Sequence, residues 1–130
     1  QHAYHRAILL NDQNAAAYNN LGYHYAEAGI RLDEALKLTQ RAVELQPGDG
    51  CFLDSLGWAY FKLGKHEKAV TLLRKATKLS PCDPEIRYHL ARALERVGRV
   101  QAARVEHKKI LWLKQALARP EYGPARRNAP

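Results

Sequence analysis

Apolar residues recur every three or four positions along most of the chain, which is the spacing of one face of an α-helix. The strongest of these stripes contains Leu53, Leu56, Tyr60 and Leu63. Gly57 lies on the same stripe without a side chain, and Gly64 follows it in the place of a glycine that ends a helix. A second stripe begins at Ala69 and stops at Pro81. We therefore predict a helix hairpin whose two helices come very close at Gly57.

The same pattern recurs on both sides of this hairpin, with a period of 34 residues between the second and third units. The repeated positions hold Leu21, Leu56 and Leu90; Gly22, Gly57 and Ala91; Tyr25, Tyr60 and Leu94; Gly29, Gly64 and Gly98; Ala35, Ala69 and Ala103; and Ala42, Ala76 and Ile110. Between the first and second units the period is 35 up to the glycine and 34 after it. One extra residue is therefore predicted in the first turn, around residues 30–32, and Asp33 is expected to cap the following helix.

A helix-turn-helix period of 34 residues with leucine-glycine, tyrosine, alanine and proline at these places resembles the tetratricopeptide repeat (TPR) family. The resemblance covers roughly residues 15–115 and depends on several positions that repeat together. It implies an all-α fold, a right-handed α-solenoid of antiparallel helix hairpins. About three full repeats and a leading half-repeat helix are expected.

The register of the repeats divides the chain into five segments. Residues 1–12 are expected to form the second helix of a truncated preceding repeat, residues 13–48, 49–83 and 84–119 three repeats, and residues 120–130 a disordered tail. In the third repeat Gln115 replaces the expected proline, so the last helix should run to about residue 118 and cap the array. Since the chain opens in the middle of a pattern, we expect it to be a piece of a longer protein.

The composition is that of a globular protein, with 46% hydrophobic residues and only eight glycines among 130 residues. No apolar run approaches the roughly 18 residues of a membrane span. The net charge of +8 is unevenly distributed, at −2 for residues 1–49, +3 for residues 50–83 and +7 for residues 84–130. The basic character therefore belongs to the C-terminal third.

The sequence contains no pattern that indicates catalysis or a cofactor. It has no nucleophile motif and no glycine-rich phosphate loop. Of the six histidines only His2 and His5 have a helical ligand spacing, and solvated surface histidines are the favoured interpretation, so no metal is expected. Cys51 and Cys82 are expected to be free thiols, because neighbouring helices lie about 8–10 Å apart, beyond disulfide reach.

The surface of the first helix in each repeat is the candidate binding site. The resemblance implies that these helices line a concave face, and that large aromatic residues with arginine anchor a partner there. The implied partner-binding residues are Asn19, Tyr23, Asp54, Trp58, Phe61, Tyr88, Arg92 and Arg96. Alternatively, Trp58 and Phe61 pack against adjacent helices as core, and His89 is either a contact residue or a packing residue.

Two narrower resemblances bear on the partner and the location. TPR co-chaperones that grip acidic chaperone C-termini use lysine, asparagine and arginine at places that hold Asn19, Tyr23, Ser55, Glu85 and His89 here, so that clamp is absent. The segments 21–23, 29–35 and 53–58 are similar to TPR arrays of Gram-negative envelope lipoproteins, some of which are adaptors. The bacterial periplasm or envelope and the cytoplasm both remain open as locations.

These observations favour a non-catalytic protein-protein interaction scaffold that binds a peptide or helix of a partner protein. The alternative is a nucleic-acid-binding helical repeat that uses the basic C-terminal third. Glu85 and Glu95 interrupt that basic face, so nucleic acid is the weaker hypothesis. Trp112 stands where its counterparts are charged, and we predict weak homodimerisation through Trp112 and Leu117.

Overall fold

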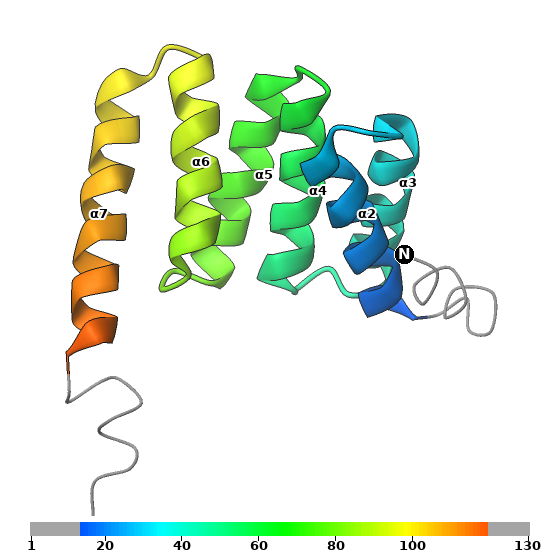
Figure 1. Ribbon diagram of the computed structural model, residues 1–130, viewed down its shortest axis with the longest axis horizontal. Coiled ribbons are helices and arrows are strands. Elements are labelled where there is room, and N and C mark those ends of the chain that lie inside the picture. The colour runs from blue at the N-terminus through cyan, green and yellow to red at the C-terminus, as the bar shows by residue number, and fades with distance from the viewer. Residues whose placement is uncertain (1–13, 120–130) are drawn as a thin grey trace, which may run out of the picture.

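The computed structural model describes residues 14–119 and contains six α-helices and no strand within that range. The helices are α2 (Ala15–Ala28), α3 (Leu32–Leu45), α4 (Gly50–Lys62), α5 (His66–Leu79), α6 (Pro84–Arg96) and α7 (Val100–Ala118). Consecutive helices form antiparallel hairpins that stand side by side in chain order, with α3 and α7 at opposite ends (Figure 1). The fold is therefore an all-α solenoid. The expected helix over residues 1–12 and the expected tail over residues 120–130 lie outside the described residues.

Each hairpin has the same local signals at the ends of its first helix. The side chains of Asn14, Asp49 and Asp83 accept hydrogen bonds from backbone N–H groups in the first turns of α2, α4 and α6. These caps satisfy donors that a helix leaves free at its start. At the other end Gly29, Gly64 and Gly98 have φ values of 72°, 85° and 83°, the left-handed conformation that favours glycine. The repeated glycines are thus the residues that end each first helix.

The extra residue of the first turn lies where the sequence predicts it. Two residues separate Gly29 from the start of α3, whereas one separates Gly64 from α5 and Gly98 from α7. Arg31 takes up the difference with φ 47°, the only positive φ outside glycine in the described range. The expectation that Asp33 caps α3 is wrong: the helix starts at Leu32, Arg31 occupies the cap position without a side-chain bond, and Asp33 lies within the first turn.

The repeated apolar positions form the core between the helices. Leu21, Leu90, Ala35, Ala69 and Ala103 are almost completely buried, and so are the other repeated leucine, tyrosine and alanine positions. The glycines on these stripes let the paired helices approach closely. A Cβ atom built on Gly57 would lie 2.9 Å from Cγ of Leu73, and one on Gly22 would lie 2.8 Å from Cγ2 of Thr39. There is accordingly no room for a side chain at either glycine.

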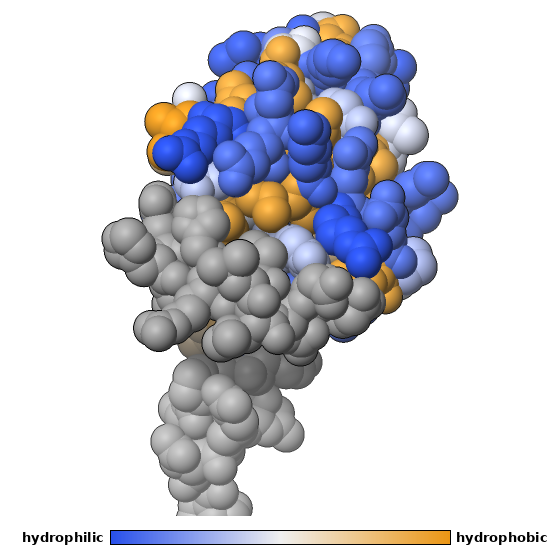
Figure 2. All heavy atoms as spheres, turned by 90° about the vertical axis from the view of Figure 1, so that its right-hand side faces the viewer, coloured by the Kyte–Doolittle hydropathy of each residue, from blue (hydrophilic) through white to orange (hydrophobic). Residues whose placement is uncertain are grey.

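Exposed apolar side chains are concentrated on the last helix. Val100, Val105, Leu111, Trp112 and Leu117 of α7 are each about half exposed or more. The opposite end of the array, built by α2 and α3, shows mainly hydrophilic side chains with smaller hydrophobic areas between them (Figure 2). No helix within residues 14–119 combines the length and hydropathy that crossing a lipid bilayer requires.

Replacing Gly57 with leucine should destabilise the protein by roughly 1–3 kcal/mol or more, because the new side chain overpacks the contact with α5. The matched control is Gly48→Ala, since a Cβ at Gly48 meets no atom within 4 Å. Urea unfolding of both variants measures the difference. Equal midpoints for the two variants would show that the hairpin does not depend on the close contact.

Candidate functional site

A hollow of about 400 Å³ opens where α2, α4 and the start of α6 meet. Its lining residues are Asn19, Asn20, Tyr23, His24, Glu27, Cys51, Asp54, Ser55, Asp83 and Glu85. Four of them are carboxylic acids and none is lysine or arginine. Since α2, α4 and α6 are the first helices of the three hairpins, the hollow lies on the face that the sequence predicts to bind a partner.

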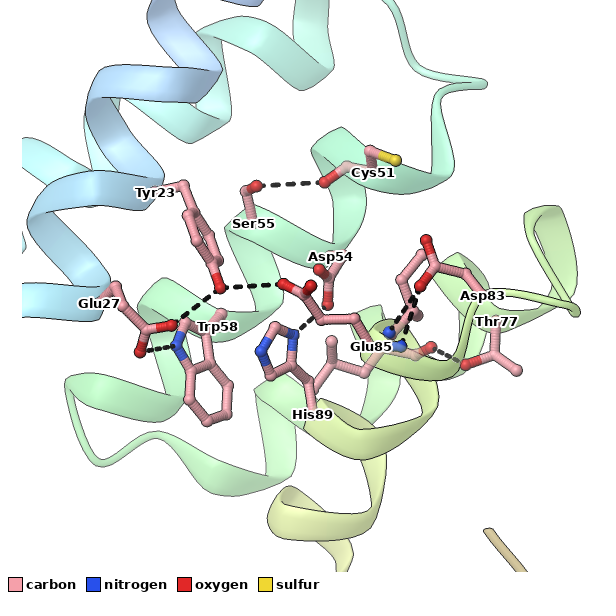
Figure 3. Close-up of polar contacts among 12 residues, drawn as sticks. Tyr23, Glu27, Cys51, Asp54, Ser55, Trp58, Thr77, Asp83, Glu85 and His89 are labelled. Carbon is pink, nitrogen blue, oxygen red and sulfur yellow. Dashed lines mark hydrogen bonds and ion pairs between the residues drawn. The ribbon is translucent and has the colours of Figure 1, made fainter. Parts of the chain in front are cut away.

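Tyr23 joins the first and third hairpins across this hollow. Its hydroxyl lies 2.9 Å from Oε2 of Glu27 and 3.1 Å from Oε1 of Glu85 (Figure 3). Glu27 is one turn away on the same helix, whereas Glu85 is 62 residues further along the chain. A phenol has a single hydrogen to donate, so it satisfies one of these two carboxylates at a time.

Next to the hollow, a stack of rings joins the second and third hairpins. The indole of Trp58 stacks on the imidazole of His89 at 4.1 Å and on the ring of Phe61 at 4.5 Å between centroids. Nδ1 of His89 lies 2.7 Å from Oδ1 of Asp54, and both residues are buried. The indole N–H points to Oε1 of Glu27 at 3.4 Å (Figure 3). The indole N–H and Nδ1 of the imidazole therefore each have a partner, as buried polar groups usually do.

Two arginines of α6 extend the ring stack towards the far side of the site. The guanidinium carbons of Arg92 and Arg96 lie 5.7 Å and 5.4 Å from the centroid of Phe61, within the range of a cation–π interaction. Arg92 also donates a hydrogen bond to the hydroxyl of Tyr88 at 3.1 Å. The site therefore changes from acidic at the start of α6 to basic near its end.

Burial and crowded carboxylates change the pKa values of three groups in the hollow. Burial raises the pKa of the Asp54 carboxyl, and the hydrogen bond from His89 opposes that rise. Burial also raises the pKa of the Tyr23 hydroxyl, with Glu27 and Glu85 adding to the effect, so the phenol stays protonated. The pKa of the Cys51 thiol, which is only partly buried, is raised by desolvation and then by Asp49, Asp83, Asp54 and Glu85. The hollow is thus an environment that disfavours additional negative charge.

The structure brings together most of the residues that the sequence singles out, in two different environments. Tyr23, Tyr88, Arg92 and Arg96 reach the surface, while Asn19 lines the hollow. Trp58 and Phe61 are only 4% and 6% exposed, so they occupy core positions, as the packing alternative described. His89 is a packing residue as well. A role of Trp58 and Phe61 in direct partner contact stays a prediction that this conformation does not support.

The two residues of the predicted self-association contact lie on the exposed side of α7. Trp112 and Leu117 are 61% and 50% exposed, whereas Ile110 and Leu113 on the same helix are buried against the fold. Homodimerisation through Trp112 and Leu117 stays a prediction. Cys51 and Cys82 are both free and exposed, as expected from helix spacing.

Sequence reasoning missed the acidic character of the hollow. The sequence did not connect Glu27, Asp83 and Glu85 with one another, and only the folded array places them in the lining of one hollow. The available signal was the spacing: Glu27 and Tyr23 are one helical turn apart, and Glu85 stands 34 residues after Cys51 on the equivalent helix face. Asp54, Glu85 and His89 also place one ligand atom each within 4.8 Å of one another, a spacing compatible with a metal ion.

Comparison with known families agrees with this geometry. A model described as TPR repeat matches residues 57–98, and one described as tetratricopeptide repeat matches residues 1–50, together more than half of the chain. The chain belongs to the TPR family. In general terms it is a protein-interaction scaffold.

Curated relatives share this TPR character over short regions. The chain is 40% identical over 83 residues to a TPR repeat-containing protein of Pseudomonas aeruginosa, a match that covers 64% of this chain and 14% of that protein. It is 32% identical over 83 residues to the BBSome complex member bbs-4 of Caenorhabditis elegans, covering 64% and 18%. It is 27% identical over 96 residues to Hsp70-Hsp90 organizing protein 1 of Glycine max, covering 74% and 17%. The chain spans less than a fifth of the length of these relatives.

Solved structures confirm the TPR fold. MamA from Desulfovibrio magneticus RS-1 superimposes with a TM-score of 0.78 at 21% identity, covering 89% of this chain and 65% of that one. A point mutant of MamA superimposes with a TM-score of 0.67 at 26% identity, covering 77% and 72%. The identity of the first of these is low enough that the likeness concerns the fold alone.

The two tryptophans should respond very differently to truncation. Trp58→Ala removes the centre of the buried stack and should cost about 3–5 kcal/mol of unfolding free energy. Trp112→Ala removes the same side chain from an exposed position and should change stability by less than about 0.5 kcal/mol. Urea unfolding followed by circular dichroism compares them. Similar losses for both variants would contradict the assignment of Trp58 to the core.

Cys51 should react more slowly with iodoacetamide than a free cysteine, because a raised pKa leaves less thiolate at any pH below it. In a Cys82→Ala background, Glu85→Gln should accelerate the reaction, since it removes one of the charges that raise the Cys51 pKa. The gain should stay below about tenfold, the effect of one pKa unit. Glu95→Gln, on the same helix outside the hollow, is the control that should leave the rate unchanged.

Proposed function

We propose that this TPR chain is a non-catalytic scaffold that binds a peptide or helix of a partner protein in the groove lined by α2, α4 and α6. The observation that carries the proposal is the hollow itself. Side chains from the first helices of all three hairpins converge on it, and Glu27 and Asp54 in its lining are bonded to an adjacent, closely packed ring stack. A groove with a rigid support and exposed polar and aromatic walls is suited to holding an elongated ligand.

The contacts around His89 support a structural role for that residue. A carboxylate paired with histidine is also the orienting half of many hydrolytic sites. Here both Asp54 and His89 are less than a tenth exposed, and the indole of Trp58 covers the imidazole at 4.1 Å. The pair therefore fixes α6 against α4 beside the groove, which fits a scaffold.

The anchors we propose for the partner are the exposed residues at the edges of the groove. Tyr88 is 43% exposed and is held by its hydrogen bond from Arg92, so its position is set before a ligand arrives. A side chain that is already ordered loses little conformational entropy on binding. Tyr23 is held in the same way by Glu27 and Glu85.

Charge at the groove argues against the nucleic-acid alternative. Phosphate groups bind where lysine and arginine cluster, and their affinity depends on the number of such contacts. Within the described residues the hollow is lined by four carboxylic acids, and Arg87 is engaged with Glu106 at 2.7 Å. No lysine or arginine of the described residues lines this hollow.

Selection of binding peptides from a random library displayed on phage tests the proposal directly. Peptides selected on the wild type should lose affinity for the double variant Tyr88→Ala and Arg92→Ala by about 2 kcal/mol or more, near thirtyfold in Kd. Arg74→Ala on α5 is the matched arginine control and should bind normally. Peptides that bind the groove variant as well as the wild type would place the ligand on another face and reject the proposal.

A further inference from the structure

The acidic hollow is electrostatically unbalanced in a chain of net charge +8. Glu27, Asp54, Asp83 and Glu85 line it, and the ion pairs among residues 14–119 include only Asp54 of these four, through His89. The other three carboxylates have no cation within the described part of the chain. Carboxylates that share a partly enclosed site repel one another unless a positive group joins them.

The hydrogen bonds within the hollow leave some acceptor oxygens without a donor. One hydroxyl hydrogen of Tyr23 serves two carboxylates, so one of Glu27 and Glu85 lacks it at any moment. Asn19, which lines the same hollow, has a buried Oδ1 without a hydrogen-bond donor among the described residues. The lining of the hollow is therefore richer in acceptors than in donors.

We propose that this hollow binds a basic side chain, arginine or lysine, of the peptide that occupies the groove. The inference deepens the proposed function and rests on it. A guanidinium offers five N–H donors in a planar fork, which matches carboxylates that approach from α2 and from α6. Tyr23 stands between those carboxylates and supplies an aromatic wall for the cation (Figure 3).

The net positive charge of the chain would favour acidic peptides. A preference for a basic residue is therefore a specific prediction. A chain of net charge +8 attracts acidic peptides at long range, and Arg92 and Arg96 near the end of α6 add to that field. A preference for a basic residue must therefore come from the hollow itself. The hollow is acidic, whereas the clamp of the TPR co-chaperones is basic. The sequence already predicted that this clamp is absent.

A metal ion fits the same atoms less well. Asp54, Glu85 and His89 offer three ligand atoms within 4.8 Å, but Nδ1 of His89 is already bonded to Asp54 at 2.7 Å. Binding an ion through those atoms would break that buried bond and move His89 out of its stack on Trp58. A basic side chain can contact Glu27 and Glu85, which meet at the Tyr23 hydroxyl, while the stack stays intact.

The test uses the peptides selected on the wild-type chain, each compared with a copy in which citrulline replaces arginine or norleucine replaces lysine. Citrulline keeps the shape of arginine and removes its charge. We expect the selected peptides to be enriched in one basic position, and its neutral copy to bind about tenfold more weakly or worse, measured by fluorescence anisotropy. In Glu85→Gln the difference between the two copies should fall below about threefold, and Glu27→Gln, made separately, should act in the same direction.

Glu95→Gln is the matched control, because it removes the same charge from the same helix outside the hollow. It should leave the preference for arginine over citrulline unchanged. Groove-binding peptides that show no basic preference, or a preference that Glu85→Gln leaves intact, would overturn this inference and leave the proposed function standing. A library that yields no groove-binding peptide would instead reject the proposed function. Saturable binding of Zn²⁺ alone that Glu85→Gln abolishes would also overturn the inference, by assigning the cluster to a metal ion.

Discussion

The close approach of the two helices within each hairpin is the constraint on which the whole array depends. Gly57 brings α4 against Leu72 and Leu73 of α5, and Gly22 brings α2 against Thr39 of α3. In the third hairpin Ala91 takes the equivalent place and is completely buried. Because the helices are this close, the opposite face of each first helix is held at a fixed distance from its neighbours. The hollow between α2, α4 and α6 owes its shape to that spacing.

The contact between the second and third hairpins has an aromatic and polar part beside its aliphatic packing. Leu53, Ala76 and Ile86 pack across it, and a ring stack and a buried carboxylate–imidazole bond join α4 to α6. Such groups have strict geometry, so they fix the angle of α6 against α4 more tightly than aliphatic packing would. Tyr23 adds a link from α2 to α6 at the surface. The groove is therefore preorganised by its own polar contacts.

The fold could be predicted from the sequence because its signals are local. Caps such as Asp49 and Asp83, glycines such as Gly64, and the repeated apolar stripes each lie within a few residues of what they determine. The start of α3 was predicted wrongly because Arg31 adopts a conformation that is rare outside glycine. No neighbouring residue in the sequence indicates that conformation. The site was less predictable. The burial of Trp58 and the meeting of Tyr23 with Glu85 depend on how one hairpin rests on the next, which spacing within a helix does not reveal.

The third hairpin exposes a different kind of surface from the one that the second hairpin buries. Phe61, Val70 and Leu73 of the second hairpin are all buried, and the residues 34 positions later are Glu95, Arg104 and His107, all exposed. Glu95 and His107 contact each other at 3.1 Å on that surface. A partner surface that covers this patch would have to strip water from these ionisable groups or pair them with charges of its own. The patch differs in this respect from the apolar surface that Leu111, Trp112 and Leu117 expose elsewhere on α7.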